Sequence, residues 1–263
     1  MTTPLPIDDL LQLARDAGAA ILQVYNTDFD VERKQDNSPL TQADLASHHT
    51  IVDALQRLTP EIPVLSEESS KIPFETRSGW GRYWLIDPLD GTKEFIKRNG
   101  EFTVNIALIE GDRPTLGVVY APVLDRLYYG IDGEGAWLQN GDEAPRQIRV
   151  ADERRSPALV AGSRSHAGES LQRFLGNLGE HELVSMGSSL KLCLVAAGEA
   201  DLYPRLGPTS EWDTAAAQAV VEAAGGRVTT LDMQPLRYNT KDSLLNPEFF
   251  VFGDDSVDWS SYL

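Results

Sequence analysis

The stretch Trp84-Leu85-Ile86-Asp87-Pro88-Leu89-Asp90-Gly91-Thr92 decides how the rest of the chain is interpreted. An apolar run ends there in two aspartates, with a proline between them and a glycine and a threonine behind them. Proline disfavours helix at the residue before it, and glycine allows a tight turn that exposes backbone N–H groups. Two carboxylates this close repel each other unless a cation lies between them. The stretch therefore indicates either a magnesium site with a phosphate position beside it, or a solvated loop of the Asp-Pro and Asp-Gly kind.

The composition fits a globular protein and narrows the classes of partner. The chain has 263 residues, of which 41% are hydrophobic and 24% charged, and its formal net charge is −17. This negative charge would repel a nucleic-acid polymer or an anionic membrane, which argues against either as the main partner. Positively charged side chains near a site could still bind a small anionic substrate. The single cysteine, Cys193, has no internal partner for a disulfide, which favours a reducing compartment. The first ten residues lack a basic segment and a long apolar core, and no apolar run reaches the roughly 20 residues of a membrane span.

Residues 1–152 are expected to form two helices and an antiparallel sheet. The segments are, in order, a helix over 7–25, a short strand at 29–33, a polar loop over 34–44, a helix from about 42 to 58, an apolar strand at 63–65 and an exposed excursion over 69–81. Alternating apolar residues and turn signals then predict a strand meander over 102–150, in which Asn140-Gly141 marks a hairpin. The two early helices are available to cover one face of this sheet.

Residues 153–263 change in style and predict an α/β unit with a largely parallel sheet. Short apolar strands at 158–161 and near 183, 202 and 228 alternate with helical stretches at about 168–178, 188–199 and 212–224, and the run 249–252 reads as a last buried strand. The overall fold class is thus α/β, with an α+β part followed by an α/β part.

Carboxylates form the main set of candidate site residues. Glu67 and Glu68 follow one apolar strand, Asp87 and Asp90 follow another, and Asp213 opens a helix. Hard divalent cations prefer oxygen ligands, and the chain offers few thiolate or imidazole groups, so magnesium is favoured over zinc. Asp213 belongs to such a site only if the fold brings its helix to the aspartate turn; otherwise it caps that helix.

Three further segments have both a catalytic and a structural interpretation. Asp44, with Thr41 before it, could orient a water molecule or could simply cap the second helix. The segment Gly162-Ser163-Arg164-Ser165-His166 carries groups that suit phosphate, and Gly187-Ser188-Ser189-Leu190-Lys191 opens a helix whose N–H groups could bind an anion. Each could also be an ordinary loop or cap. The histidines at 48, 49 and 181 have no evident partners in the sequence.

Taken together, these segments resemble the lithium-sensitive, magnesium-dependent phosphatases that include inositol monophosphatase. The resemblance lies in Glu67-Glu68, in the Asp87 to Thr92 signature and in Trp212-Asp213 followed by an alanine-rich helix, and it covers nearly the whole chain. Within this family the chain looks most like the 3′(2′),5′-bisphosphate nucleotidases of the CysQ type. That narrower likeness is carried by residues 34–44, 162–166, 187–191 and 202–213.

The resemblance implies a layered α/β/α/β/α sandwich and a role for each candidate residue. Two or three magnesium ions would be bound by Glu67, Asp87, Asp90, Asp213 and the Leu89 carbonyl. Asp44 and Thr92 would orient and deprotonate the attacking water, with Glu67 also in the catalytic set and Glu68 behind it. The substrate-binding set would comprise Glu67, Leu89, Asp90, Gly91, Thr92, Ser163, Arg164, Ser165, His166, Gly187, Ser188, Lys191 and Asp213.

The implied reaction is hydrolysis of the 3′-phosphate of adenosine 3′,5′-bisphosphate to AMP and phosphate, with 3′-phosphoadenylyl sulfate as a further candidate substrate. Two metal ions would neutralise the phosphate and activate water, so that no covalent nucleophile is needed. A phosphatase of inositol or sugar phosphates on the same scaffold is the close alternative, and a non-catalytic phosphometabolite sensor is the alternative from another class. The resemblance further implies a role in sulfur assimilation or nucleotide recycling and a cytoplasmic monomer or homodimer, with peripheral membrane association left open.

Overall fold

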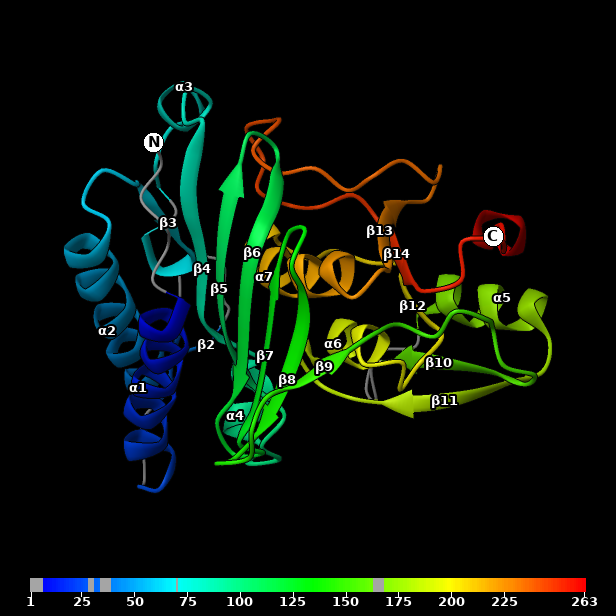
Figure 1. The fold of residues 1–263 in the computed structure, drawn as a ribbon, viewed down its shortest axis with the longest axis horizontal. Coiled ribbons are helices and arrows are strands. Elements are labelled where there is room, and N and C mark those ends of the chain that lie inside the picture. The colour runs from blue at the N-terminus through cyan, green and yellow to red at the C-terminus, as the bar shows by residue number, and fades with distance from the viewer. Residues whose placement is uncertain (1–6, 28–30, 34–38, 70, 163–167) are drawn as a thin grey trace.

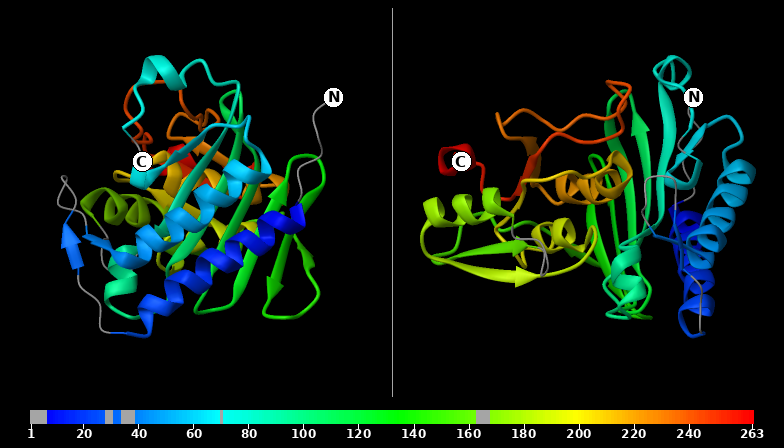
Figure 2. Two further views of the ribbon diagram at one scale, coloured as in Figure 1. Left: turned by 90° about the vertical axis from the view of Figure 1, so that its left-hand side faces the viewer. Right: turned by 180° about the vertical axis from the view of Figure 1, so that it is seen from behind.

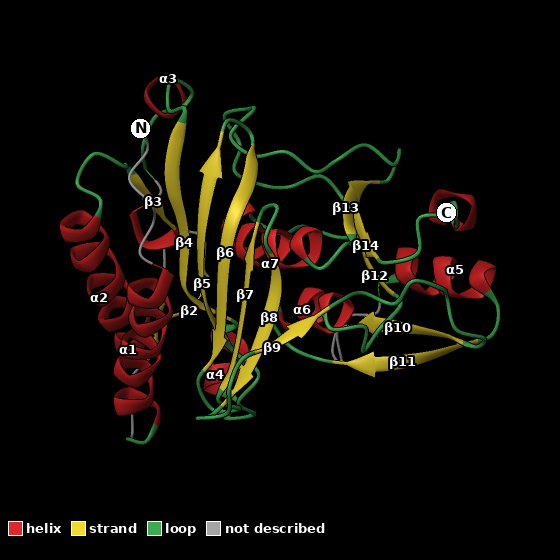
Figure 3. Cartoon of the chain, viewed as in Figure 1, coloured by secondary structure: helices red, strands yellow, loops and turns green. Residues whose placement is uncertain are grey.

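The chain folds into five layers, seen edge-on in Figure 1. The structure, a computed structural model, describes residues 7–27, 31–33, 39–69, 71–162 and 168–263. A seven-stranded sheet and a five-stranded sheet each have helices on both faces. The layers confirm the expected α/β/α/β/α sandwich, and Figure 3 shows the middle helices between the two sheets.

The seven-stranded sheet has the order β3-β4-β5-β6-β7-β8-β9. Its strands are β3 (Val64–Ser66), β4 (Arg82–Asp90), β5 (Thr103–Glu110), β6 (Arg113–Ala121), β7 (Arg126–Ile131), β8 (Gly135–Asn140) and β9 (Arg146–Ile148). β3 runs parallel to β4, and every later pair is antiparallel. The meander expected over 102–150 is therefore confirmed, including the hairpin that follows Asn140.

The outer face of this sheet is covered by α1 (Ile7–Tyr25) and α2 (Gln42–Leu58), which lie side by side in Figure 2. α1 buries Leu10, Leu13, Ala14, Ala17 and Ile21, the stripe expected from its period. α2 begins with a capping box, in which Thr41 and Asp44 satisfy each other's backbone donors. Asp44 therefore does cap α2, and this contact does not decide whether it also has a catalytic role.

The five-stranded sheet has the order β11-β10-β12-β14-β13. Its strands are β10 (Ala158–Gly162), β11 (His181–Ser185), β12 (Leu202–Arg205), β13 (Arg227–Thr230) and β14 (Phe249–Phe252). β14 runs antiparallel to both of its neighbours, and the other paired strands are parallel. The expectation of a largely parallel sheet is confirmed, because only the last strand reverses direction.

Helices from the second half fill the middle and far layers. α6 (Leu190–Ala196) and α7 (Glu211–Ala223) pack between the sheets, whereas α5 (Glu169–Leu178) and the 3₁₀ turn η2 (Trp259–Tyr262) cover the far face of the five-stranded sheet. α7 packs directly on β5, β6 and β7 of the first sheet. The division of the chain near residue 152 stays a prediction.

Four local expectations need correction. Residues 39–41 form strand β2 (Pro39–Thr41), paired with β1 (Val31–Arg33), so the loop expected over 34–44 is wrong beyond residue 38. The excursion over 69–81 contains the helix α3 (Phe74–Arg77). Arg77 is buried there and bonds Asn239 and the Lys241 carbonyl, because a distant loop folds over it. The helix expected from 188 begins at 190, and Ser188 has a left-handed φ of 45°.

The fourth correction concerns the end of β4. The strand does not stop before Asp87 but continues to Asp90, with a register shift between the two aspartates. Asp87 faces Asn105 and Asp90 faces Thr103, so three steps on β4 match two on β5. Such an extra residue is a β-bulge, and Pro88 suits it because proline has no N–H to donate.

In the described ranges, no helix is both long and apolar enough to cross a membrane.

Candidate active site

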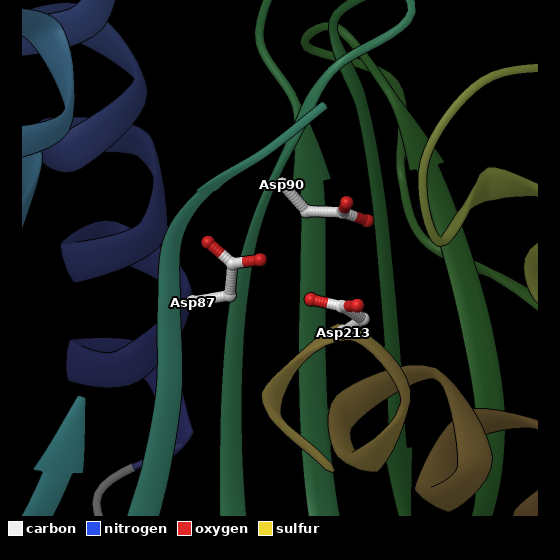
Figure 4. A group of neighbouring side chains, drawn as sticks. All are labelled: Asp87, Asp90 and Asp213. Carbon is white, nitrogen blue, oxygen red and sulfur yellow. The ribbon is translucent and has the colours of Figure 1, made fainter. Parts of the chain in front are cut away.

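Three aspartates from two distant parts of the chain, the end of β4 and the start of α7, point toward one another (Figure 4). Each of Asp87, Asp90 and Asp213 offers a carboxylate oxygen, and these oxygens all lie within 4.8 Å of one another. Side chains alternate along a regular strand, so residues three apart would face opposite sides of the sheet. The extra residue in β4 brings Asp87 and Asp90 to the same side.

Asp213 reaches this cluster because α7 packs very closely on the sheet. A Cβ at Gly117 of β6 would lie 2.0 Å from the Ala216 carbonyl oxygen, so only glycine permits this approach. The buried alanines of α7 have small side chains, which also let the helix approach the sheet closely. Asp213 is also the third residue of a capping box, and its Oδ2 accepts the Ser210 N–H at 2.9 Å. Asp213 therefore caps its helix and belongs to the aspartate cluster at the same time.

Burial and mutual repulsion dominate the electrostatics of the cluster. Desolvation first, and then the charges of Glu67, Asp90 and Asp213, raise the pKa of Asp87 well above its ordinary value. Desolvation followed by the charge of Asp90 raises the pKa of Asp213 to about 8. Burial also raises the pKa of Asp90, although Lys191 and the Ser189 N–H oppose that shift. Without a counter-charge the cluster thus holds protons that a cation would displace.

Glu67 approaches the cluster from the 3₁₀ turn η1 (Glu67–Ser69), directly after β3. It bonds the carboxyl group of Asp87 and raises the pKa of that group, so the two side chains are in contact. Glu68 follows it in the same turn, where its N–H donates to Ser66 Oγ at 3.3 Å. The structure therefore brings Glu67 to the aspartates and leaves Glu68 behind it.

Asp44 and Thr92 meet beside the cluster. Thr92 opens the short helix α4 (Thr92–Ile96), and its Oγ1 donates to Asp44 Oδ1 at 3.4 Å. The other carboxylate oxygen of Asp44 accepts from Thr41 Oγ1 at 2.6 Å and from the Thr41 N–H at 2.8 Å. Asp44 is 1% exposed, so one of its oxygens serves the cap while the other faces Thr92.

The glycine that follows the aspartates allows the chain to turn into α4. Gly91 has φ of +94°, and a Cβ there would come within 3.3 Å of the Glu101 carbonyl oxygen and of Ser188 Cβ. L residues with a side chain rarely adopt this backbone conformation. The turn therefore packs against the segment before α6, which places the start of α6 next to the site.

The start of α6 already binds protein carboxylates. The Ser189 N–H donates to Asp90 Oδ2 at 2.6 Å, and the Gly187 N–H donates to Glu101 Oε2 at 2.8 Å. Lys191 is buried and donates to the Ser188 carbonyl at 2.6 Å, which holds the segment in its turn. These N–H groups are thus less available to a substrate anion than the sequence suggests, although the substrate role of this segment stays a prediction.

Comparison with known proteins now places the chain in a family. The sequence model of the inositol monophosphatase family matches residues 6–250. The chain belongs to the inositol monophosphatase family. The resemblance expected from the sequence is confirmed, and the cluster of Asp87, Asp90 and Asp213 lies in the matched region of this family member.

Relatives within the inositol monophosphatase family are similar over nearly their whole length. The 3'(2'),5'-bisphosphate nucleotidase CysQ of Escherichia coli (strain K12) is 56% identical over 247 residues, which cover 93% of this chain and 98% of that protein. The crystal structure of CysQ from Bacteroides thetaiotaomicron is 43% identical and has a TM-score of 0.81, covering 95% of this chain and 98% of that chain. The inositol monophosphatase of Anabaena (Nostoc) sp. PCC 7120 is 28% identical, with a TM-score of 0.75.

The aspartate cluster fits a hard divalent cation. Three carboxylates converge, one buried (Asp87) and two half-buried, each has a raised pKa, and no cysteine or histidine belongs to the cluster in the described ranges. Oxygen donors that repel one another when ionised are the ligands that magnesium or a similar ion stabilises. Which ion binds, and how many, stays a prediction.

Some sequence expectations about the site lie outside what the structure places. Ser163, Arg164, Ser165 and His166 fall outside the described residues. His48, for which the sequence suggested no partner, is bonded to Ser66 Oγ at 2.9 Å, which corrects that expectation. Sequence reasoning also missed the polar groups under Asp90, namely Thr103, Asn105 and the Ser189 hydroxyl. Their signal was weak, because a threonine and an asparagine inside a buried strand look like ordinary strand residues.

Proposed function

We propose that the chain is a metal-dependent 3′(2′),5′-bisphosphate nucleotidase, which converts adenosine 3′,5′-bisphosphate to AMP and phosphate. The observation that carries the proposal is the convergence of Asp87, Asp90 and Asp213 beside the Asp44–Thr92 pair. The 56% identity to the E. coli nucleotidase favours this substrate over others of the family. We extend the proposal to 3′-phosphoadenylyl sulfate, which carries the same 3′-phosphate.

The metal ligands in this proposal are Glu67, Asp87, Asp90, Asp213 and the Leu89 carbonyl, for two or three magnesium ions. Bound magnesium would neutralise the phosphate, lower the pKa of a water molecule and stabilise the leaving oxygen. The raised pKa values of Asp87 and Asp213 support this role, since carboxyl groups that resist ionisation alone are stabilised as ligands. Asp87 is central, because it contacts Glu67 and faces both other aspartates.

Water activation is assigned to Thr92 and Asp44. The Thr92 hydroxyl donates its single proton to Asp44, so its lone pairs remain to accept a hydrogen bond from water. A proton released by that water would pass through the hydroxyl to Asp44. Asp44 is held in place by Thr41, which fixes the direction of this transfer. Such positioned acid–base groups contribute about 10²–10⁴-fold to a rate.

Substrate binding is assigned to groups around this centre. The backbone N–H groups of Gly91 and Thr92 would face the phosphate that is removed. Lys191, which is buried near Asp90, would supply positive charge toward a second phosphate together with Ser188 and the 163–166 segment.

The test is phosphate release from four substrates side by side, with magnesium present: adenosine 3′,5′-bisphosphate, 3′-phosphoadenylyl sulfate, inositol 1-phosphate and fructose 1,6-bisphosphate. We expect the two nucleotides to have the highest kcat/KM, loss of turnover when a chelator removes the metal, and inhibition by lithium. A preference for inositol 1-phosphate or fructose 1,6-bisphosphate would assign the chain to the other phosphatases of the family. Binding of the nucleotide without turnover of any of the four would instead indicate a sensor.

A further inference from the structure

A small polar network lies next to Asp90, between β5 and the start of α6. Thr103 and Asn105 of β5 face Asp90 and Asp87 across the strand pair, and Ser189 reaches them from the start of α6. All three side chains are buried, with exposed fractions of 0%, 1% and 2%. Buried polar groups are costly unless they are bonded, so a network this close to the aspartates needs an explanation.

The hydrogen bonds in this network have only one consistent direction. Ser189 Oγ lies 2.9 Å from Asn105 Oδ1, and a carbonyl oxygen can only accept, so the serine proton points to Asn105. Thr103 Oγ1 lies 2.8 Å from the same serine oxygen and must therefore donate to it. The result is a chain from Thr103 to Ser189 to Asn105. The contact of Thr103 with Ser188 Oγ, at 3.4 Å, is longer and weaker.

The neighbouring Asp90 carboxylate supports this orientation of the asparagine amide. With Oδ1 turned to Ser189, Nδ2 is the free end of the network, and it is buried without a regular hydrogen bond in the described part of the chain. Asp90 and Asn105 both contact Ser189, one at its N–H and the other at its Oγ, so the amide lies near the Asp90 carboxyl group. There it favours the charged form of Asp90. The opposite orientation would set a carbonyl oxygen against a carboxylate, which is repulsive.

We propose that Asn105 is a positioning residue for Asp90, and that the Thr103–Ser189–Asn105 network aims its Nδ2–H group at that carboxylate. Asp90 is then held from two sides, by the Asn105 amide from β5 and by the Ser189 N–H from α6. Ser189 takes part in both contacts, so the packing of α6 against β5 sets the position of the ligand. The inference rests on the proposed metal role of Asp90, because groups that orient a ligand change metal affinity about 10–100-fold when removed.

The test measures binding of Mn²⁺, as a probe metal, to the full chain without substrate, by titration calorimetry or by the spin resonance signal of the free ion. We expect about 10-fold weaker binding for Asn105→Ala, and a loss in the same direction for Ser189→Ala, which retains the backbone N–H to Asp90. Thr103→Val should weaken binding less, and Thr103→Ser should restore it. Thr229→Val, which removes a buried hydroxyl far from the site, is the matched control for folding.

The outcomes separate this inference from the proposed function. If Asp90→Asn loses Mn²⁺ binding while folded Asn105→Ala, Ser189→Ala and Thr103→Val bind like the parent chain, the network is only structural and the inference fails. If Asp90→Asn itself binds Mn²⁺ normally, the metal role of Asp90 fails instead. A shift in the melting temperature without a change in Mn²⁺ affinity also counts against the inference, because a merely structural role would produce it.

Discussion

The Ser189 N–H donates to Asp90 Oδ2 at 2.6 Å, across 99 positions of the sequence. This bond joins the bulged end of β4 to the start of α6, and so connects the seven-stranded sheet to the middle helix layer at the aspartate cluster. Asp213 reaches the same cluster from α7. The site is therefore assembled by packing between layers, and changes that loosen this packing should affect the site before they unfold the chain.

Replacing Asp90 with asparagine should separate stability from function. The change removes one of the carboxylate charges that repel one another in the cluster, so the metal-free protein should melt at a higher temperature. The same change removes a proposed metal ligand, and kcat should fall about 1,000-fold, roughly 4 kcal/mol in activation free energy. Thermal unfolding with a chelator and phosphate-release kinetics measure the two effects. Asp132→Asn, in an exposed pair with Arg113, is the control, and a near-normal rate in Asp90→Asn would refute the metal role.

Changes at Asp44 and Thr92 should distinguish a catalytic pair from a helix cap. Asparagine at position 44 still offers an oxygen to the Thr41 N–H, so the cap survives in Asp44→Asn while the proton acceptor is lost. We expect Asp44→Asn and Thr92→Val to lower kcat about 100-fold or more, with little change in melting temperature. Thr92→Ser should keep most of the rate. If Asp44→Asn retains full kcat, Asp44 acts only as a cap.

Metal-free stability should depend on pH with a defined sign. The pKa of Asp213 is raised from 3.8 to about 8 in the folded protein, so the folded state holds a proton that the unfolded chain releases more easily. The stability that protonated Asp213 contributes is therefore fully present at low pH. It is lost as the pH rises through the window from 3.8 to about 8. Urea unfolding at pH 6 and pH 8 with a chelator tests this. Added Mg²⁺ should restore more stability at pH 8, and an equal or greater gain at pH 6 would contradict the expectation.

A side chain at Gly117 should push α7 away from the sheet. The added Cβ of Gly117→Ala would lie 2.0 Å from the Ala216 carbonyl oxygen, a backbone atom that cannot rotate aside. We expect a loss of about 1–3 kcal/mol in unfolding free energy, together with weaker Mn²⁺ binding as Asp213 shifts. Denaturant unfolding and metal titration measure both. Gly81→Ala, where a Cβ meets nothing within 4 Å, is the matched control and should leave both unchanged.

Most elements of the fold were predictable because their signals are local. The period of α1, the strand meander after residue 102 and the alternation of strands and helices after residue 152 all follow from side-chain patterns within one segment. Arg77 was not predictable in this way. Its partners Asn239 and Lys241 lie far along the chain, so a polar segment that looks exposed in the sequence is buried by another loop.

In the candidate site, too, local sequence signals were informative and contacts between distant residues were not predictable. The residue types at Glu67, Asp87, Asp90 and Thr92 are enough to suggest oxygen ligands and a hydroxyl next to them. Whether Asp44 and Asp213 are caps or site residues was undecided by spacing, since a capping box uses the same carboxylates. In the structure both are in capping boxes, while Asp213 also joins the aspartate cluster and Asp44 also contacts Thr92.

The sequence alone determined the chemistry available to this protein: an acidic chain, two aspartates around a proline, and the family resemblance that these motifs carry. Tertiary structure alone decided which groups meet. The bulge in β4 turns Asp87 and Asp90 to one side, Gly117 lets α7 bring in Asp213, and Ser189 holds Asp90 from the start of α6. The physical reason is that a side-chain pattern specifies which face of an element is buried, whereas contacts between distant residues depend on how closely the backbones can approach.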